Sequence, residues 1–451
     1  MLCQQEQTIS VPKNFLEHFP APSVASVTVQ SLEAAMANSL SKAALKASGP
    51  ADRNKARHVI SLSLSKTADE LINPKLILTW LITALGAPAY LSGAVVPIRE
   101  AGALLPQPLI ARFVQRYQLR KMFWALGALL QGAAAFAIAM IALRVDGTLA
   151  GWLILLSLLL FVAGRSLAST TYKDALARTV EEGERGHITG WAGTVAAVAG
   201  LAFGASMALG VWGQVSVPVV AAAIGVSAVM FACASCVFIG LNEDASENKS
   251  EQIKSIVSFI KPLREDKDFR RYVLARAFLT ATALAPPFIV LASAQSESNS
   301  LTTLGPLVIA SGLAAIVSSA AWGYLSDTAS RLSLAIGGGI ATIAYAIAAF
   351  LILLEDGSLA TLAAASILFV AQVGYQGVRS GRSIYLTDMA NDRDRLQYTA
   401  LSNILIGTVL AAGLGLAGVA EVFGAAFALA VCAAMSAVGV FFAFTLQELS
   451  K

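Results

Sequence analysis

Hydrophobic residues in this chain gather in long runs that are separated by short polar and basic stretches. Because a helix needs about 20 residues to cross a bilayer core, each run is long enough to form a membrane-spanning helix. From residue 75 onward the pattern predicts twelve spans, at 75–95, 96–115, 122–144, 149–172, 188–211, 217–240, 271–293, 302–324, 332–354, 359–382, 397–418 and 423–445. The one long connection, residues 241–270, contains an amphipathic piece and divides the spans six and six.

The stretch from residue 96 to residue 121 shows the pattern most clearly. It opens on Arg99 and Glu100, continues with largely uncharged residues, and closes on a basic cluster at 116–121. This is the profile of a spanning helix that enters the membrane with an ion pair and leaves it on a positively charged side. Two prolines lie in its middle, which spanning helices tolerate because neighbouring helices and water satisfy the freed carbonyls.

Residues 1–74 precede the spans and are polar, with helix-forming composition at 30–47 that breaks at 50–57. They contain no early apolar core ahead of a small-residue cleavage site, so we expect no secretory signal. The predicted organisation is a partly helical or disordered cytoplasmic extension at 1–74, a six-helix bundle at 75–240, a cytoplasmic linker at 241–270, a second six-helix bundle at 271–445 and a cytoplasmic C-terminus at 446–451.

Composition excludes a chain of soluble domains. Of the 451 residues, 56% are hydrophobic and only 13% are charged, about half of the roughly 25% that soluble domains carry. Of the 32 Lys and Arg residues, only Arg99 and Arg144 fall at span ends that alternate with the basic side. Because Lys and Arg concentrate in cytoplasmic loops, we expect both termini in the cytoplasm of a multi-pass inner-membrane protein. The net charge of +4 reflects these loops and indicates no nucleic-acid partner.

The two halves of the chain resemble each other in sequence. The matches pair Arg120 with Arg331 at an offset of 211, Arg185 with Arg395 and Thr189 with Thr399 at an offset of 210, and Pro88 with Pro287 in the first span of each half. Near-equal offsets at independent places predict a parallel repeat of six spans. Such a repeat places a substrate site between the halves, near the bilayer midplane.

The loop after the second span and its counterpart after the eighth resemble the signature of the major facilitator superfamily, roughly G-x-x-x-D-R-x-G-R-R/K. The first copy keeps only Arg120 and Lys121, whereas the second keeps Gly323, Asp327 and Arg331 at the family spacing.

Two further stretches resemble this family. Residues 164–190 are similar to the end of its fourth span, and residues 264–279 are similar to its entry into the second half. The resemblance covers residues 75–445 and implies an all-α integral membrane protein of twelve helices in two pseudo-symmetric bundles. It also implies a proteobacterial-type permease, whose substrate it leaves unassigned because this fold serves many solutes.

Charged residues inside spans are costly and mark functional positions. Arg99 and Glu100 have two interpretations: Glu100 takes and releases a proton beside Arg99, or both side chains reach the outer surface as an interfacial pair. Gln107 lies deeper in the same span and either lines a cavity or bonds a neighbouring backbone. Arg165 lies about 16 residues into its span and is either an anion-binding or gating residue or a structural hydrogen-bond donor.

Further candidates lie near the cytoplasmic span ends. Tyr375 and Gln376 could offer hydrogen bonds to a ligand, one turn before Arg379. The gating candidates are Lys173, Asp174, Asp327, Arg331, Arg379 and Arg382, with Asp388 as a further partner. The alternative for these residues is ordinary positive-inside anchoring, which we also expect of Arg276. Pro88 and Pro287 either mark helix breaks near the site or serve packing alone.

Other chemistry finds no support in the sequence. There is no G-x-x-x-x-G-K-[ST] motif, and His18, His58 and His187 all lie outside the expected spans. Cys233 and Cys236 form a C-x-x-C inside an apolar run, where small packing residues are the simpler interpretation. We therefore expect no cofactor, no metal site and no enzyme.

The sequence favours a secondary transporter that moves a small solute by alternating access, coupled to protons through Glu100. Intramembrane arginines tilt the expected solute toward anionic or amphipathic compounds, and resemblance to drug and siderophore exporters after Arg99 favours export. Its expected partners are the solute, protons and the lipid bilayer, and we expect a monomer. The alternative is a non-transporting receptor or assembly factor with this fold, acting through its N-terminal extension.

Overall fold

A computed structural model describes residues 50–114, 116–181, 184–211, 216–243, 256–295, 304–355, 357–389 and 395–447. The chain divides into residues 1–53 and 54–451, and the description below concerns the second unit. The helix expected at 30–47 lies outside the described residues.

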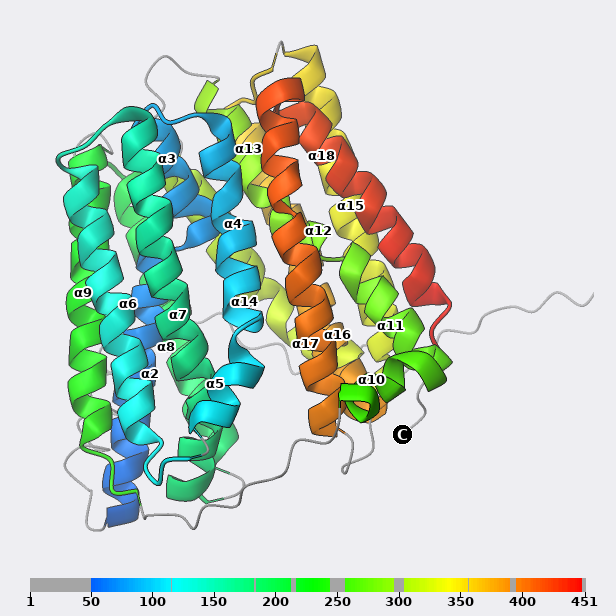
Figure 1. Ribbon diagram of the computed structural model, residues 1–451. Coiled ribbons are helices and arrows are strands. Elements are labelled where there is room, and N and C mark those ends of the chain that lie inside the picture. The colour runs from blue at the N-terminus through cyan, green and yellow to red at the C-terminus, as the bar shows by residue number, and fades with distance from the viewer. Residues whose placement is uncertain are drawn as a thin grey trace, which may run out of the picture. The chain divides into compact units, whose positions relative to one another are not determined.

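The described residues form helices and no strand (Figure 1). The first half contains α2 Pro50–Leu71, the π-helix η2 Pro74–Leu78, α3 Thr79–Ala84, α4 Ala89–Leu104, α5 Gln107–Val114, α6 Lys121–Ala142, α7 Gly147–Thr179, α8 Arg185–Ala208 and α9 Val217–Ile239. The second half contains α10 Ile256–Glu265, α11 Lys267–Phe278, α12 Ala281–Leu284, α13 Pro286–Gln295, α14 Leu304–Thr328, α15 Ser330–Leu354, α16 Thr361–Met389, α17 Arg395–Ala412 and α18 Leu414–Phe444.

Nine helical segments among the described residues are long and apolar enough to cross a membrane. One of them, Gln397–Phe444, has 48 residues and is interrupted at Gly424, whose φ of 84° is left-handed, so it is long enough for two crossings. The broken helices α2–η2–α3 and α4–α5 provide two more candidates beyond these nine. The total of twelve spans therefore stays a prediction. The nine segments, a second crossing within Gln397–Phe444 and the two broken helices would together supply twelve.

The break that we expected at 50–57 is wrong. Residues 50–71 form the continuous helix α2, where the sequence analysis expected a polar extension and a break at 50–57. Asn54 fixes this helix inside the fold: its amide donates to the carbonyl of Asn242 (2.9 Å), and its carbonyl accepts from the Asn242 N–H (2.9 Å). Satisfied polar groups of this kind allow a polar helix to be buried among apolar ones.

The boundary between the first two expected spans is also wrong, by about ten residues. The chain turns at Gly86, whose φ of 76° suits a residue without a side chain, and Pro88 caps the start of α4. Arg99 and Glu100 therefore lie inside α4, and the break in this helix falls at Leu105 and Pro106, before α5.

The sequence repeat is visible in how the helices pack. A Cβ added to Gly127 would lie 2.6 Å from the Gly164 carbonyl oxygen, which shows that α6 and α7 touch backbone to backbone. At an offset of 210, a Cβ on Gly337 would lie 2.7 Å from the Gly374 carbonyl oxygen, between α15 and α16. Glycine permits this close approach because it has no Cβ.

The same offset revises one sequence match. Lys121 donates from Nζ to the Leu241 carbonyl (2.6 Å), and Arg331 donates to the Leu446 carbonyl (3.2 Å), so Lys121 rather than Arg120 corresponds to Arg331. Pro88 and Pro287 do not correspond, because Pro88 precedes α4 whereas Pro287 lies inside α13.

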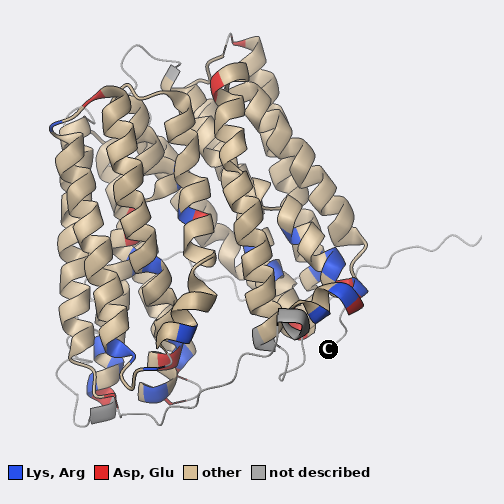
Figure 2. Cartoon of the chain, in the orientation of Figure 1, with Lys and Arg blue, Asp and Glu red and all other residues tan. Residues whose placement is uncertain are grey.

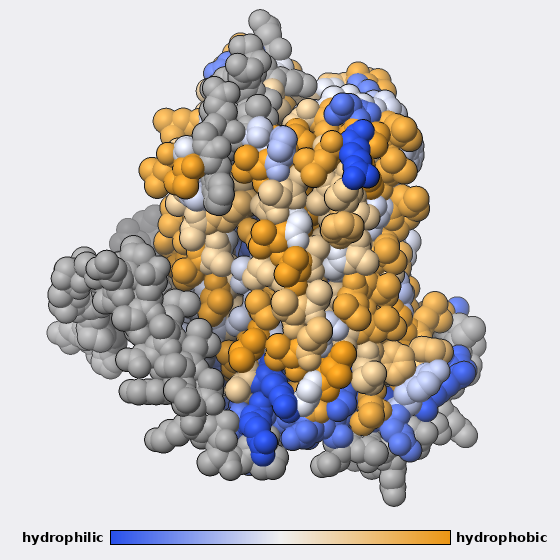
Figure 3. Space-filling model, turned by 90° about the vertical axis from the view of Figure 1, so that its left-hand side faces the viewer, coloured by the Kyte–Doolittle hydropathy of each residue, from blue (hydrophilic) through white to orange (hydrophobic). Residues whose placement is uncertain are grey.

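Figure 2 shows Lys and Arg gathered at one end of the helices, called the basic end below, with further charges within the helices. Large apolar side chains are exposed along the helices between the two ends, among them Phe136, Leu156, Ile343 and Phe350. Figure 3 shows one face of the first half, on which apolar surface spreads between hydrophilic residues at the two ends, as expected of a membrane protein.

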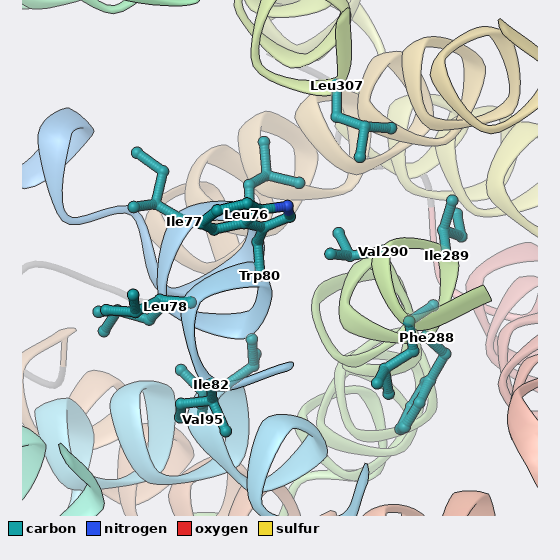
Figure 4. Packing of buried hydrophobic residues seen from close by; sticks show 14 of the residues in the cluster. Leu76, Ile77, Leu78, Trp80, Ile82, Val95, Phe288, Ile289, Val290 and Leu307 are labelled. Carbon is teal, nitrogen blue, oxygen red and sulfur yellow. The ribbon is translucent and has the colours of Figure 1, made fainter. Parts of the chain in front are cut away.

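Several close contacts between the halves lie toward the end opposite the basic end, and α17 also packs on α4 deeper in the fold, where Gly407 lies against Leu105. A Cβ on Gly305 in α14 would lie 2.7 Å from the Ala208 nitrogen at the end of α8, and the Tyr90 N–H at the start of α4 donates to Glu421 Oε2 (3.0 Å). Buried apolar residues continue this contact inward. Figure 4 shows Leu76 and Trp80 of the first half near Val290 and Leu307 of the second.

Candidate functional site

Asp69 on α2 lies at the centre of a group of charged side chains within the helices. Its two carboxylate oxygens accept hydrogen bonds from Arg99 on α4 (3.4 Å) and from Arg165 on α7. The exposed fractions of the side chains are 14% for Asp69, 12% for Arg99 and 33% for Arg165. One buried carboxylate therefore holds two guanidinium groups from different helices, and this pairing lowers the cost of burying all three charges.

Arg99 lies well inside its helix and forms an ion pair there. It lies ten residues into α4, which is about 15 Å along the helix at 1.5 Å per residue. Its guanidinium lies 5.5 Å from the centroid of the Phe161 ring, on the inner side of α7. The turn at Gly86 places the start of this helix ahead of Arg99, and both interpretations of Arg99 and Glu100 stay predictions.

Lys75 joins the two halves beside this group. Its Nζ lies 3.4 Å from the centroid of the Tyr375 ring on α16, in a cation–π contact. Lys75 lies on η2. Asn73 caps the start of this π-helix, because its side-chain oxygen accepts a hydrogen bond from the Lys75 N–H (3.0 Å). Single π-turns within helices often occur at functional sites. The cations that act electrostatically on Glu100 are Lys75, Arg99, Arg382 and Arg379.

The α16 helix contributes two cations to the same group. Arg379 is exposed and Arg382 is partly buried, and within the described residues neither guanidinium has an ion-pair partner. The expected gate pairs with Asp327 or Asp388 are therefore not formed in this structure. Gln376 also makes no hydrogen bond to a described residue.

Arg276 on α11 is buried with neutral partners. It donates to Ser402 Oγ (2.7 Å) and to Asn403 Oδ1 (3.1 Å), and its Nε has no partner among the described atoms. Asn403 in turn donates to Gln107 Oε1 across the two halves (3.3 Å), and Gln107 donates to Ser169 Oγ (3.5 Å). Gln107 therefore bonds side chains on both halves rather than a neighbouring backbone, and its role in lining a cavity stays a prediction.

Two gating candidates, Lys173 and Asp174, lie at the basic end of the first half. Asp174 forms ion pairs within that half and, among the described residues, none between the halves. Asp174 pairs with Arg120 (2.5 Å) and with Arg178 (3.0 Å), and Arg178 reaches Glu243 (3.6 Å). These ion pairs tie α7 to the segments before α6 and after α9, inside one half. Lys173 is exposed, with no ion-pair partner in the described part of the chain.

Sequence reasoning did not single out Lys66 and Asp69, because it assigned residues 1–74 to a cytoplasmic extension. It also passed over Lys75, which is the first residue of the first expected span. The available signal was that apolar residues recur through the polar stretch 58–75 and lead directly into the apolar run at 76–84. In that stretch Lys66, Asp69 and Asn73 recur at helical spacing. Arg276, which we expected to be an anchor, also belongs among the buried charges.

Known proteins resemble this chain in sequence and in fold. A family model described as Major Facilitator Superfamily matches residues 59–381. The chain belongs to the major facilitator superfamily. Its members are transporters and not enzymes. No curated protein matches this major facilitator.

Three solved structures resemble this major facilitator in fold. They are a POT family transporter in complex with 5-aminolevulinic acid (TM-score 0.65, 10% identity, 87% of this chain and 95% of that chain), the nucleoside transporter NupG (0.65, 13%, 87% and 100%) and the E. coli fucose:proton symporter FucP (0.52, 15%, 87% and 98%). At these identities the likeness shows the shared fold.

Proposed function

We propose that this major facilitator carries an anionic solute by alternating access, and that Asp69 couples its movement to protons. The observation that carries the anionic solute is an excess of cations within the helices. The cations are Lys66, Lys75, Arg99, Arg165, Arg276, Arg379 and Arg382, and the carboxylates are Asp69, Glu70 and Glu100. Because a buried charge needs a partner, this imbalance favours a negatively charged ligand.

Asp69 replaces Glu100 as our candidate for the coupling residue. Its carboxylate faces Arg99 and Arg165, with Lys66 and Glu70 as further charged neighbours on its own helix. Protonation of Asp69 would remove the charge that holds Arg165 and free this guanidinium for the solute. The fucose:proton symporter among the structural neighbours is consistent with a proton-coupled member of the fold.

The arrangement of the halves supports a state that is open toward the cytoplasm. Contacts between α8 and α14 and between α4 and α18 close the end opposite the basic end, and positive charge marks the cytoplasmic side. We therefore propose that Lys66, Arg165 and Arg379 face the cytoplasm in this state. Export, which the sequence favours, then begins with the solute binding to these cations.

The proposal is tested with purified protein in detergent and in liposomes that enclose a pH-sensitive dye. Benzoate and succinate, but not glucose or choline, should raise the melting temperature, because a ligand that binds only the folded state stabilises it. The same two acids should change the internal pH of the liposomes. A response to glucose or choline alone would contradict an anionic solute.

Asp69→Asn should abolish the pH change while the acids still raise the melting temperature. The exposed Asp146, changed to Asn, serves as the matched control and should leave both signals intact. If Glu100→Gln abolishes the pH change and Asp69→Asn does not, then Glu100 is the coupling residue and our assignment of Asp69 is wrong.

A further inference from the structure

Cations that lack a carboxylate partner face each other from the two halves. On the first half, Lys66 on α2 donates to the Thr189 carbonyl at 3.0 Å and forms no ion pair within the described residues, with Asp69 as a charged neighbour. Asp69 is occupied by Arg99 and Arg165. Glu70, four residues after Lys66, accepts from the Asn73 amide (3.4 Å).

The second half presents its cations toward the first. The contact of Lys75 with the Tyr375 ring shows which face of α16 is turned toward η2. Arg379 and Arg382 follow Tyr375 by four and seven residues, so they lie on that same face. Arg379 is in turn a charged neighbour of Lys66, together with Arg165.

Like charges across this contact oppose closure of the halves at the basic end. Coulomb repulsion is strong where water is partly excluded. The carboxylates that act on Arg379, Glu70 and Glu100, are outnumbered by the cations Lys66, Lys75, Arg379 and Arg382. The halves touch at the opposite end through uncharged residues such as Gly305 and Ala208, and nearer the basic end through the neutral amides of Gln107 and Asn403. A single anionic group could neutralise the cations of one half, but the cations of the other half would stay unpaired.

We infer that the solute carries two separate anionic groups and bridges the halves, one group on Lys66 and Arg165 and the other on Arg379 and Arg382. This inference rests on the proposed function and narrows the anionic solute to a dianion of the dicarboxylate type. Binding of such a solute converts the repulsion between the halves into attraction, and so permits the basic end to close.

The test compares two series of acids by thermal shift and by titration calorimetry of the full-length protein. The first series runs from malonate to adipate, with two carboxylates, and the second contains monocarboxylates with the same numbers of carbons. Inorganic phosphate supplies two charges on a single group. At least one dicarboxylate should bind tenfold or more tightly than its monocarboxylate partner and than phosphate.

Variants then locate the two groups. Lys66→Gln and Arg379→Gln should each weaken dicarboxylate binding about tenfold and leave monocarboxylate binding within about twofold, whereas Lys66→Arg should retain dicarboxylate binding. The exposed Arg144, changed to Gln, is the control and should have no effect. Arg379→Glu places opposite charges across the halves, so it should raise the melting temperature without ligand and abolish the response to dicarboxylates.

The outcomes separate this inference from the proposed function. Equal binding of monocarboxylates and dicarboxylates would overturn the two-group solute and leave an anionic solute standing. The absence of a response to every acid in both series would overturn both. An Arg379→Glu protein that folds, as judged by gel filtration, and still responds to dicarboxylates would show that Arg379 is not part of the site.

Discussion

At the scale of single residues, the charges within the helices fall into two kinds. Asp69, Arg99 and Arg165 satisfy one another, whereas Arg276 is buried against neutral partners. A buried charge without a counter-charge destabilises the empty protein, since its desolvation is offset only by hydrogen bonds. We therefore interpret Arg276 as a residue kept for binding at the expense of stability.

Arg276→Gln should raise the free energy of unfolding of the ligand-free protein by about 1–2 kcal/mol, because the amide keeps polar contacts with Ser402 and Asn403 and removes the charge. Chemical unfolding in detergent, followed by circular dichroism, measures this. Arg178→Gln is the matched comparison and should be destabilising instead, because it leaves the buried Glu243 with one cation fewer. A destabilised Arg276→Gln protein would contradict this assignment.

The sequence predicted several of these residues but not how they combine. Arg99, Glu100, Gln107 and Arg165 stood out because a charge or amide in an apolar run is unusual. Asp69 did not, because α2 is polar over much of its length and its burial depends on contacts with distant segments, such as that of Asn54 with Asn242. Local pattern cannot report contacts of that range.

At the scale of helices, the two glycine contacts at an offset of 210 set how closely the helix pairs approach. In each pair the place of a Cβ is already taken by the backbone of the neighbouring helix. The long apolar runs predicted these helices well, since α6 to α9 and α14 to α16 lie close to the expected spans. The broken helices were harder to predict, because the breaks at Asn73 and Leu105 interrupt the pattern that the prediction relies on.

Gly127→Ala and Gly337→Ala should destabilise the protein to a similar extent, by about 1–3 kcal/mol each, because an added methyl group would overlap a carbonyl oxygen on the facing helix. Unfolding in detergent measures both variants. A Cβ on Gly225 in α9 meets no atom within 4 Å, so Gly225→Ala is the control and should be neutral or slightly stabilising. A large difference between the first two variants would argue against equivalent packing in the two halves.

At the scale of the whole transporter, the structure captures one state of the halves. They meet through α8 and α14 and through α4 and α18, at the end opposite the basic end. The family resemblance predicted two related halves, but neither the resemblance nor the hydrophobic pattern indicates which end is closed. That choice depends on packing across the halves, for instance of Gly204 against Val308.

Gly305→Trp should open the closed end, because its side chain would displace the backbone of Ala208. The readout is the rate at which a membrane-impermeant maleimide modifies Val308→Cys, with the native cysteines replaced by alanine. Val308 is buried, so we expect slow labelling in the parent and at least tenfold faster labelling with Gly305→Trp. Gly418 has free space around it, and Gly418→Trp should leave the rate unchanged. Unchanged labelling in Gly305→Trp would contradict the assignment of this contact as the closure.

The apolar layer of Leu76, Trp80, Val290 and Leu307 has an electrical consequence. A membrane voltage falls mostly across the part of its path that excludes water and ions, and here that part is this layer. Each elementary charge that crosses the full voltage gains or loses about 2.3 kcal/mol per 100 mV. A dianion that moves with one proton carries net charge through the layer, whereas a dianion with two protons carries none. The electric current that accompanies transport would therefore report how many protons move with each dianion.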